Sequence, residues 1–410
     1  MKTYMFPGQG SQRKGMGEGL FDRFPAMTNM ADSILGYSIK DLCLNDPEHK
    51  LNKTEYTQPA MYIVNALSYV GKTQDTGEKP DFLTGHSLGE YNALQAAGVF
   101  SFEDGVRLVK KRGELMGQAR NGGMAAIINS TENEILKILQ DANLSTIDIA
   151  NLNSSAQIVI SGLKEDINNS QQFFEKAKIM FIPLNTNGAF HSRYMEQAEK
   201  EFKEYVDSFT LLEPQIPVIS NVTATPYDSK AVVQNLTRQI TSSVRWNDSV
   251  MYLLEQGDME FLEVGVGDVL TKLVVSIKRD WASARESSKE LPEQKVESGA
   301  DKVENSNPIV KAADISEEPM PIRETAAKIS IPDCDAEKTT ALKNPSLNGQ
   351  ELVERWNQTY SVGKRVTSDI YDIELETKTE AILLFGHRAA VYMKGYNGYF
   401  DLREVTPVNG

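Results

Sequence analysis

Short apolar runs alternate with longer amphipathic stretches over the first 280 residues, and this alternation predicts an α/β fold. Helical spacing is clearest in Phe102–Ala119, where Leu108, Val109, Leu115 and Met116 form one stripe. The predicted strands include Lys2–Phe6, Phe82–Thr84, Pro217–Asn221 and Phe261–Val264. The other predicted helices are Met16–Ile39, Thr57–Val70 with Thr57 as its N-cap, Leu88–Ala97, Tyr194–Phe209, Asn235–Thr241 and Val269–Lys278.

The pattern changes between residues 123 and 186. Strand-like and helix-like segments follow one another there in the order β-α-β-β-α-β, which is typical of a ferredoxin-like unit. The predicted strands are Met124–Ile128, Ile147–Asn151, Gln157–Ser161 and Ile179–Leu184, with helices at Glu132–Ala142 and Asp166–Ala177. We expect this unit to be a small subdomain inserted into a larger one, which comprises residues 1–122 and 187–280.

Beyond residue 280 the composition separates two further segments. Residues 283–347 contain no Phe, Tyr or Trp and are rich in charged residues, Ser and Pro, so we expect a flexible linker. Residues 350–407 are aromatic again, with short strand-like runs and a hairpin signal at Asn397-Gly398. They predict a small C-terminal all-β module of unknown role, in which His387 is interpreted as structural.

Composition narrows the class of protein. The chain has 410 residues and a net charge of −14, which disfavours nucleic acids and anionic membranes as partners. No apolar run is long enough to span a bilayer, and no signal-peptide pattern is present, so we expect a cytoplasmic protein. The two cysteines lie far apart and the four histidines show no i,i+4 pairing, so we expect no metal site.

Gly85-His86-Ser87-Leu88-Gly89 has the G-x-S-x-G pattern of a nucleophile elbow, placed between a predicted strand and a predicted helix. Small residues at 85 and 89 are needed because a serine on such a sharp turn crowds its neighbours. The pattern favours Ser87 as a nucleophile. The alternative is a glycine-rich turn with a surface serine.

Three more residues are candidates for the same chemistry. His191 follows a strand and precedes a helix, which suits a catalytic base, although a surface or capping histidine fits the same pattern. Arg112 lies within an apolar stripe and must find an anion there, either an internal Asp or Glu or a substrate carboxylate. The loop at Gln9, between two glycines, can present a backbone N–H.

Together these residues suit acyl transfer through a serine ester. Ser87 and His191 form the minimal nucleophile and base, and the backbone N–H groups of Gln9 and Leu88 would stabilise the oxyanion. A third group to orient His191 is not obvious. Glu263 and a backbone carbonyl both remain open.

Eight motifs resemble those of the malonyl-CoA:acyl carrier protein transacylases, in the same order and spacing, over about two thirds of the chain. The resemblance implies an α/β-hydrolase-like large subdomain and a ferredoxin-like small one. The overall likeness is greatest to discrete acyltransferases that serve polyketide synthases. The motifs are FPGQGSQ (6–12), TQPA (57–60), GHSLGEY (85–91), RGELM (112–116), NLNSSAQIVISG (151–162), GAFHS (188–192), VRW (244–246) and EVGVGDVLT (263–271).

The resemblance also implies a role for each matching residue. Arg112 would pair with the malonyl carboxylate, and Phe190 would crowd an α-methyl group and so favour malonyl over methylmalonyl. The remaining implied roles are Ser87 as nucleophile, His191 as base, Gln9 and Leu88 as the oxyanion hole, the main-chain carbonyl of Arg245 as the group that orients His191, and Gln58, His86 and Asn153 as pocket-lining residues.

The sequence therefore predicts transfer of malonyl from malonyl-CoA to the phosphopantetheine thiol of an acyl carrier protein, for polyketide or fatty acid synthesis. Polyketide synthase modules are possible further partners. Coenzyme A enters as a thioester substrate, and no bound cofactor is expected. One alternative is an acyl hydrolase that clears acyl groups from carrier proteins. The other is a docking or scaffold protein of a synthase assembly.

Overall fold

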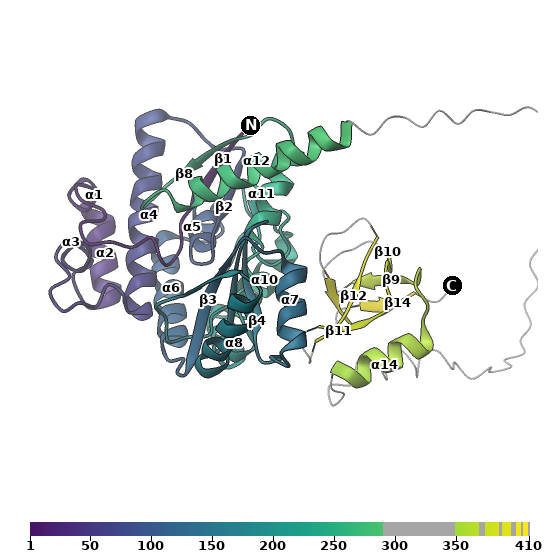
Figure 1. Cartoon of the computed structure of the whole chain (residues 1–410). Coiled ribbons are helices and arrows are strands. Elements are labelled where there is room, and N and C mark those ends of the chain that lie inside the picture. Colours follow the sequence, from purple (N-terminus) through teal and green to yellow (C-terminus); the bar gives the residue numbers. More distant parts are fainter. Residues whose placement is uncertain (290–348, 369–373, 385–387, 395–398, 403–404, 409–410) are drawn as a thin grey trace, which may run out of the picture.

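The computed structural model describes residues 1–289, 349–368, 374–384, 388–394, 399–402 and 405–408. A parallel four-stranded sheet in the order β7-β2-β1-β8 forms the centre of the first 289 residues (Figure 1). Its strands are β1 (Lys2–Phe6), β2 (Phe82–Gly85), β7 (Val218–Ile219) and β8 (Glu260–Glu263). The four predicted strands therefore lie side by side, with their carboxyl ends at one edge of the sheet.

Side chains alternate between the two faces of this sheet, as the period of a strand requires. Tyr4 and Phe6 join the large core cluster under α4 (Thr54–Thr76), α5 (Gly89–Ala96) and α6 (Phe102–Gly117), whereas Met5 joins a cluster with α11 (Trp246–Glu255) and α12 (Val269–Lys289). The sheet is thus buried on both faces. The remaining helices here are α1 (Leu20–Arg23), α2 (Pro25–Leu35), α3 (Ile39–Leu44), α9 (Glu196–Val206) and α10 (Val232–Arg238), with short turns η1 (Arg193–Met195) and η2 (Ser229–Ala231).

A second, antiparallel sheet is built from residues 122–183 in the order β4-β5-β3-β6. The chain order is β3 (Gly122–Ile128), α7 (Glu132–Asp141), β4 (Asp148–Ser154), β5 (Gln157–Leu163), α8 (Lys164–Lys176) and β6 (Met180–Pro183). One face packs against α7 and α8 (Figure 1). Met124, Ala126, Ala150 and Val159 belong instead to the core of the parallel sheet, so the second sheet is anchored to the first.

Two details of the N-terminal helices differ from the prediction. The stretch Met16–Ile39 is not one helix, because α1 ends at Arg23, Pro25 opens α2, and α2 ends at Gly36 with φ of 83°. Helix α4 begins at Thr54, before the predicted N-cap at Thr57. The Thr57 hydroxyl donates to the carbonyls of Leu51 and Lys53, so it lies inside the helix.

The C-terminal residues include a helix, so the prediction of an all-β module is wrong on this point. Helix α14 (Gly349–Thr359) contributes Leu352 and Trp356, four residues apart, to a small core. The strands are β9 (Arg365–Ser368), β10 (Glu374–Glu376), β11 (Ile382–Leu384), β12 (Arg388–Tyr392), β13 (Tyr399–Asp401) and β14 (Val405–Pro407), in two antiparallel sheets β10-β9-β14 and β11-β12-β13.

Helix α12 continues to Lys289, beyond the predicted linker start at residue 283. The rest of the linker, His387 and the Asn397-Gly398 turn lie outside the described residues. Within the described residues, no helix combines the length and hydropathy that crossing a bilayer requires. The same residues contain no group of three or more His, Cys, Asp or Glu side chains arranged to hold a metal ion.

Candidate active site

Ser87 lies on a sharp turn at the carboxyl end of β2. The backbone φ of Ser87 is 51°, in the left-handed region that residues other than glycine rarely adopt. A Cβ on Gly85 would lie 2.0 Å from the carbonyl carbon of Gly89, and a Cβ on Gly89 would lie 2.0 Å from the Phe6 oxygen. Both glycines are therefore required by close backbone contacts, as the elbow pattern predicts.

His191 lies next to Ser87 although 104 residues separate them. The Ser87 Oγ and the His191 Nε2 are 2.8 Å apart, and the His191 Nδ1 lies 2.8 Å from the backbone oxygen of Gln239. Because a carbonyl oxygen only accepts, the Nδ1 carries the proton and the Nε2 is left to accept the serine proton. Burial, with the positive charge of Arg112 as the next cause, lowers the pKa of His191 to about 3, so the ring is a neutral base near pH 7.

The carbonyl that orients His191 belongs to Gln239, and the expectation for Arg245 is wrong. Arg245 is the N-cap of α11, and its carbonyl accepts from the backbone N–H and the hydroxyl of Ser249. Gln239, in contrast, is the C-cap of α10. Carbonyls at a helix C-terminus have no intrahelical partner, so the Gln239 oxygen is available to the histidine.

Arg112 extends from α6 toward the same serine and is 1 % exposed. Its Nη1 donates to the Gln58 Oε1 at 2.9 Å, and its Nη2 lies 2.8 Å from the Gln239 Oε1 and 3.2 Å from the Ser87 Oγ. Its Nε makes no hydrogen bond, and the guanidinium lies over the Tyr91 ring at 5.3 Å.

The neighbours of Arg112 leave its charge without a direct counter-ion. In the described part of the chain, no carboxylate lies within ion-pair distance of Arg112, and its hydrogen-bond acceptors are neutral amide and hydroxyl oxygens. A buried cation is costly unless it is paired. Among the described residues, the internal Asp or Glu that the sequence left open makes no direct contact with Arg112, and the nearby buried Glu90 acts on it only at longer range. A carboxylate bound beside Ser87 would complete the site.

The loop after β1 lies against the elbow. A Cβ on Gly8 would come within 2.3 Å of the His86 oxygen and 3.6 Å of the Leu88 nitrogen. The backbone N–H groups of Gln9 and Leu88 have no hydrogen-bond partner among the described residues. The two predicted oxyanion donors therefore come from adjacent strand ends, next to the serine.

The four residues predicted to line the pocket make different contacts. Gln58 is buried and holds Arg112. His86 joins the elbow to the antiparallel sheet, because its Nε2 lies 2.8 Å from the Asn153 Oδ1 on β4; burial lowers the pKa of His86. Phe190 is buried beside Gly188, where an added Cβ would lie 2.2 Å from its ring.

Three residues of this site were not predicted from the sequence: Gln239, Asn221 and Glu90. The Asn221 Oδ1 accepts from the Ser87 N–H at 2.7 Å, and its Nδ2 donates to the Gly85 oxygen at 2.7 Å, so Asn221 holds both sides of the elbow. A signal for Asn221 was present in the sequence, since it follows β7, whose end lies beside the end of β2. Glu90 stands in the motif GHSLGEY but was given no role, and Gln239 gave no comparable signal.

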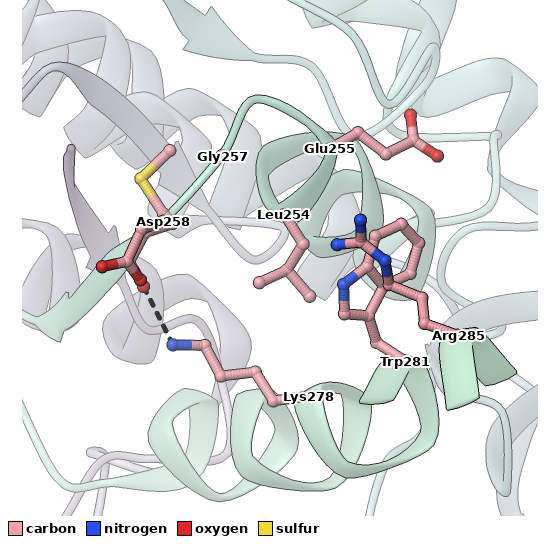
Figure 2. A pocket seen from close by; sticks show the side chains of 8 residues that line it. Leu254, Glu255, Gly257, Asp258, Lys278, Trp281 and Arg285 are labelled. Carbon is pink, nitrogen blue, oxygen red and sulfur yellow. Dashed lines mark hydrogen bonds between the residues drawn. The ribbon is translucent and has the colours of Figure 1, made fainter. Parts of the chain in front are cut away.

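A separate surface pocket of about 680 Å³ lies between the α11–β8 turn and α12 (Figure 2). Figure 2 shows Trp281 and Arg285 of α12 across the pocket from Leu254 of α11, with Lys278 of α12 pointing toward Asp258. The Lys278 Nζ donates to the Met259 oxygen at 2.9 Å, and the Arg285 guanidinium lies over the Trp281 ring. This pocket lies at the amino end of β8, whereas Ser87 follows the carboxyl end of β2, so the two lie at opposite edges of the sheet.

Comparisons with known proteins agree with this geometry. The acyl transferase domain family matches residues 3–300. The polyketide biosynthesis malonyl CoA-acyl carrier protein transacylase PksC of Bacillus subtilis is 55% identical over 282 residues, which are 68% of this chain and 98% of that protein. The crystal structure of a malonyl CoA-acyl carrier protein transacylase from Burkholderia pseudomallei is 51% identical, with a TM-score of 0.67, over 68% of this chain and 98% of that one.

A second similar structure was solved with a protein partner. It is a malonyl-transacylase in complex with its type II polyketide synthase acyl-carrier protein, and it is 33% identical with a TM-score of 0.65. The match covers 68% of this chain and 93% of that one.

Proposed function

The chain belongs to the acyl transferase domain family, and from that premise we propose that it transfers malonyl from malonyl-CoA to the phosphopantetheine thiol of an acyl carrier protein. Polyketide synthesis is the expected context, because the relative PksC is named for it. The observation that carries the proposal is Arg112, a buried arginine with a free Nε and an Nη2 3.2 Å from the Ser87 Oγ.

The reaction proceeds in two half-reactions through an ester on Ser87. In the first, the His191 Nε2 takes the serine proton as the Oγ attacks the thioester carbonyl, and the backbone N–H groups of Gln9 and Leu88 stabilise the oxyanion. The C–S bond then breaks, and His191 returns the proton to the coenzyme A sulfur. In the second, the carrier-protein thiol gives its proton to His191 and attacks the ester carbonyl. The bond between the acyl carbon and the Ser87 Oγ then breaks, and His191 returns the proton to that Oγ.

Arg112 gives this site its preference among acyl groups. A guanidinium binds a carboxylate with two parallel hydrogen bonds, and burial strengthens them because water is excluded. Malonyl carries a carboxylate at the position that Arg112 faces, and acetyl does not. Phe190 would disfavour a methyl branch on the same acyl group by about 1–3 kcal/mol.

The finer architecture belongs to this proposal as well. We regard residues 1–122 and 187–280 as an α/β-hydrolase-like subdomain, and residues 123–186 as a ferredoxin-like one. The basis is the parallel sheet with its elbow, and the antiparallel order β4-β5-β3-β6. The part of the predicted linker that follows α12, residues 290–347, is proposed as a linker, residues 350–407 as a separate module, and the whole chain as cytoplasmic.

Mass spectrometry of the intact protein tests the proposed function. The wild-type protein incubated with malonyl-CoA should gain one malonyl group, which peptide mapping should place on Ser87. Ser87→Ala should gain none. Adding a phosphopantetheinylated carrier protein should then move the group to its thiol. Release of free malonate without transfer would favour the hydrolase alternative, and no adduct on folded wild-type protein would contradict acyl transfer altogether.

A further inference from the structure

We propose that Glu90 is a positioning residue that acts through the Gln239 side chain to hold Arg112 ready for the acyl carboxylate. The inference rests on the proposed malonyl transfer and adds a residue to it. Glu90 touches neither Ser87 Oγ nor Arg112 by a hydrogen bond, yet malonyl selectivity would depend on it.

Glu90 is fully buried on α5, one turn beyond the elbow, and three donors point at its carboxylate. The Oε1 accepts from the Asn221 N–H at 3.0 Å and from the Tyr227 hydroxyl at 2.6 Å. The Oε2 accepts from the Gln239 Nε2. An ionised carboxylate is an acceptor only, so these three donors match that form of Glu90.

The contact with Glu90 fixes which way the Gln239 amide faces. The Gln239 NH2 group donates to the backbone carbonyl oxygen of Ser87 at 2.8 Å and to the Glu90 carboxylate. This leaves the Gln239 Oε1 to accept from the Arg112 Nη2 at 2.8 Å. Arg112 can only donate. If the amide turned over, its NH2 group would face the guanidinium, and both groups would lose a partner. Glu90 and the Ser87 backbone carbonyl, which both only accept, therefore together select the orientation in which Gln239 supports Arg112.

The charged and titratable groups around Glu90 and its burial act on the carboxylate in opposite directions. Arg112 of α6 supplies a nearby positive charge, and the pKa values of Tyr227 and Tyr91 are raised by burial, so both phenols stay neutral. Burial, the largest cause, raises the pKa of Glu90 to about 7 against the opposing hydrogen bonds from Tyr227, Asn221 and Gln239, so the form that accepts from all three donors predominates above about pH 7.

The test compares the rates at which Ser87 is acylated by malonyl-CoA and by acetyl-CoA, measured on the intact protein. Nucleophile, base and oxyanion donors serve both acyl groups, so their contribution cancels in the ratio of the two rates. Glu90→Gln places an NH2 group against the Gln239 amide and should lower the malonyl-to-acetyl ratio about tenfold or more, with the acetyl rate changed less than about threefold.

Tyr227→Phe is the matched control. It removes one donor from the same carboxylate but leaves the Oε2 contact with Gln239, so the ratio should stay within about twofold of wild type. If Glu90→Gln does not fold, Gln239→Met tests the same link, because it removes the amide and keeps the backbone carbonyl that orients His191. The ratio should fall there too.

An unchanged ratio in folded Glu90→Gln, or in Gln239→Met, would overturn the inference. So would an equal loss of both rates, which is the mark of a merely structural role. These results are distinguishable from failure of the proposed function, because in that case the wild-type protein itself would take no malonyl group.

Discussion

The two edges of the central parallel sheet differ in what their loops carry. At the carboxyl edge, Asn221 after β7, His191 before η1 and Arg112 of α6 are buried polar residues whose hydrogen bonds converge on Ser87. At the amino edge, the pocket beside β8 is open, and its charged residues Glu255, Asp258 and Arg285 are exposed. This difference indicates that the active site is identified by buried polar atoms that converge on one residue, and not by the volume of a pocket.

Replacing the base should produce the largest effect at the carboxyl edge. His191→Ala leaves Ser87 without a proton acceptor, so acylation by malonyl-CoA should fall by about three orders of magnitude or more. Stopped-flow or quenched-flow measurement of the malonyl adduct checks this. A loss below about tenfold would mean that another group acts as base.

Arg112→Ala should produce the next largest effect. Removing a buried partner of a bound carboxylate costs about 2–5 kcal/mol, so malonyl acylation should fall by roughly 30- to 5000-fold. Acetyl acylation lacks this contact and should fall much less. The rates of acylation by malonyl-CoA and by acetyl-CoA check this prediction. Arg112→Lys is the control, because it retains the positive charge but cannot form the two parallel hydrogen bonds of a guanidinium. Malonyl preference that survives Arg112→Ala would contradict the carboxylate-binding role.

The site could be predicted from the sequence only as far as side-chain chemistry revealed it. Ser87 and His191 carry recognisable motifs, and both lie where those motifs place them. Gln239 escaped prediction because a backbone carbonyl has no sequence signature, and its availability depends on where α10 ends. Arg245 was chosen in its place, although a residue at a helix start has its carbonyl already engaged.

The fold shows the same limit. Strand β1 matches its predicted bounds because a short apolar run before a proline has few other interpretations. Helix α14 was missed in a segment judged by its strand-like runs, although Leu352 and Trp356 are spaced for one helix face. The partners of Glu90 lie 131 to 149 residues further along the chain, and a local sequence pattern does not reveal tertiary contacts of that kind.

Glu90 offers a smaller, pH-dependent effect at the carboxyl edge. Burial raises its pKa from 4.5 to about 7, so the stability it contributes is full below pH 4.5 and is lost as pH rises through 7. Glu90→Gln lacks this titration. The melting temperature of the variant minus that of wild type should therefore become more positive between pH 5 and pH 8. Thermal unfolding at several pH values checks the sign of this difference in melting temperature. A difference that becomes more negative would mean that burial does not raise the pKa of Glu90.

The smallest effect is expected at the amino edge. Trp281→Ala removes the largest side chain of the pocket in Figure 2 and touches none of the groups around Ser87. Malonyl acylation should stay within about twofold of wild type. A loss of tenfold or more in the folded variant would show that the two edges are not independent.

The most direct test of the central claim is a crystal structure of the protein after reaction with malonyl-CoA. We expect an ester on the Ser87 Oγ, with the free carboxylate hydrogen-bonded to Arg112 through its Nε and one terminal nitrogen. Gln239 should still hold the His191 ring. An ester whose carboxylate points to solvent, with the Arg112 Nε still unbonded, would contradict the account.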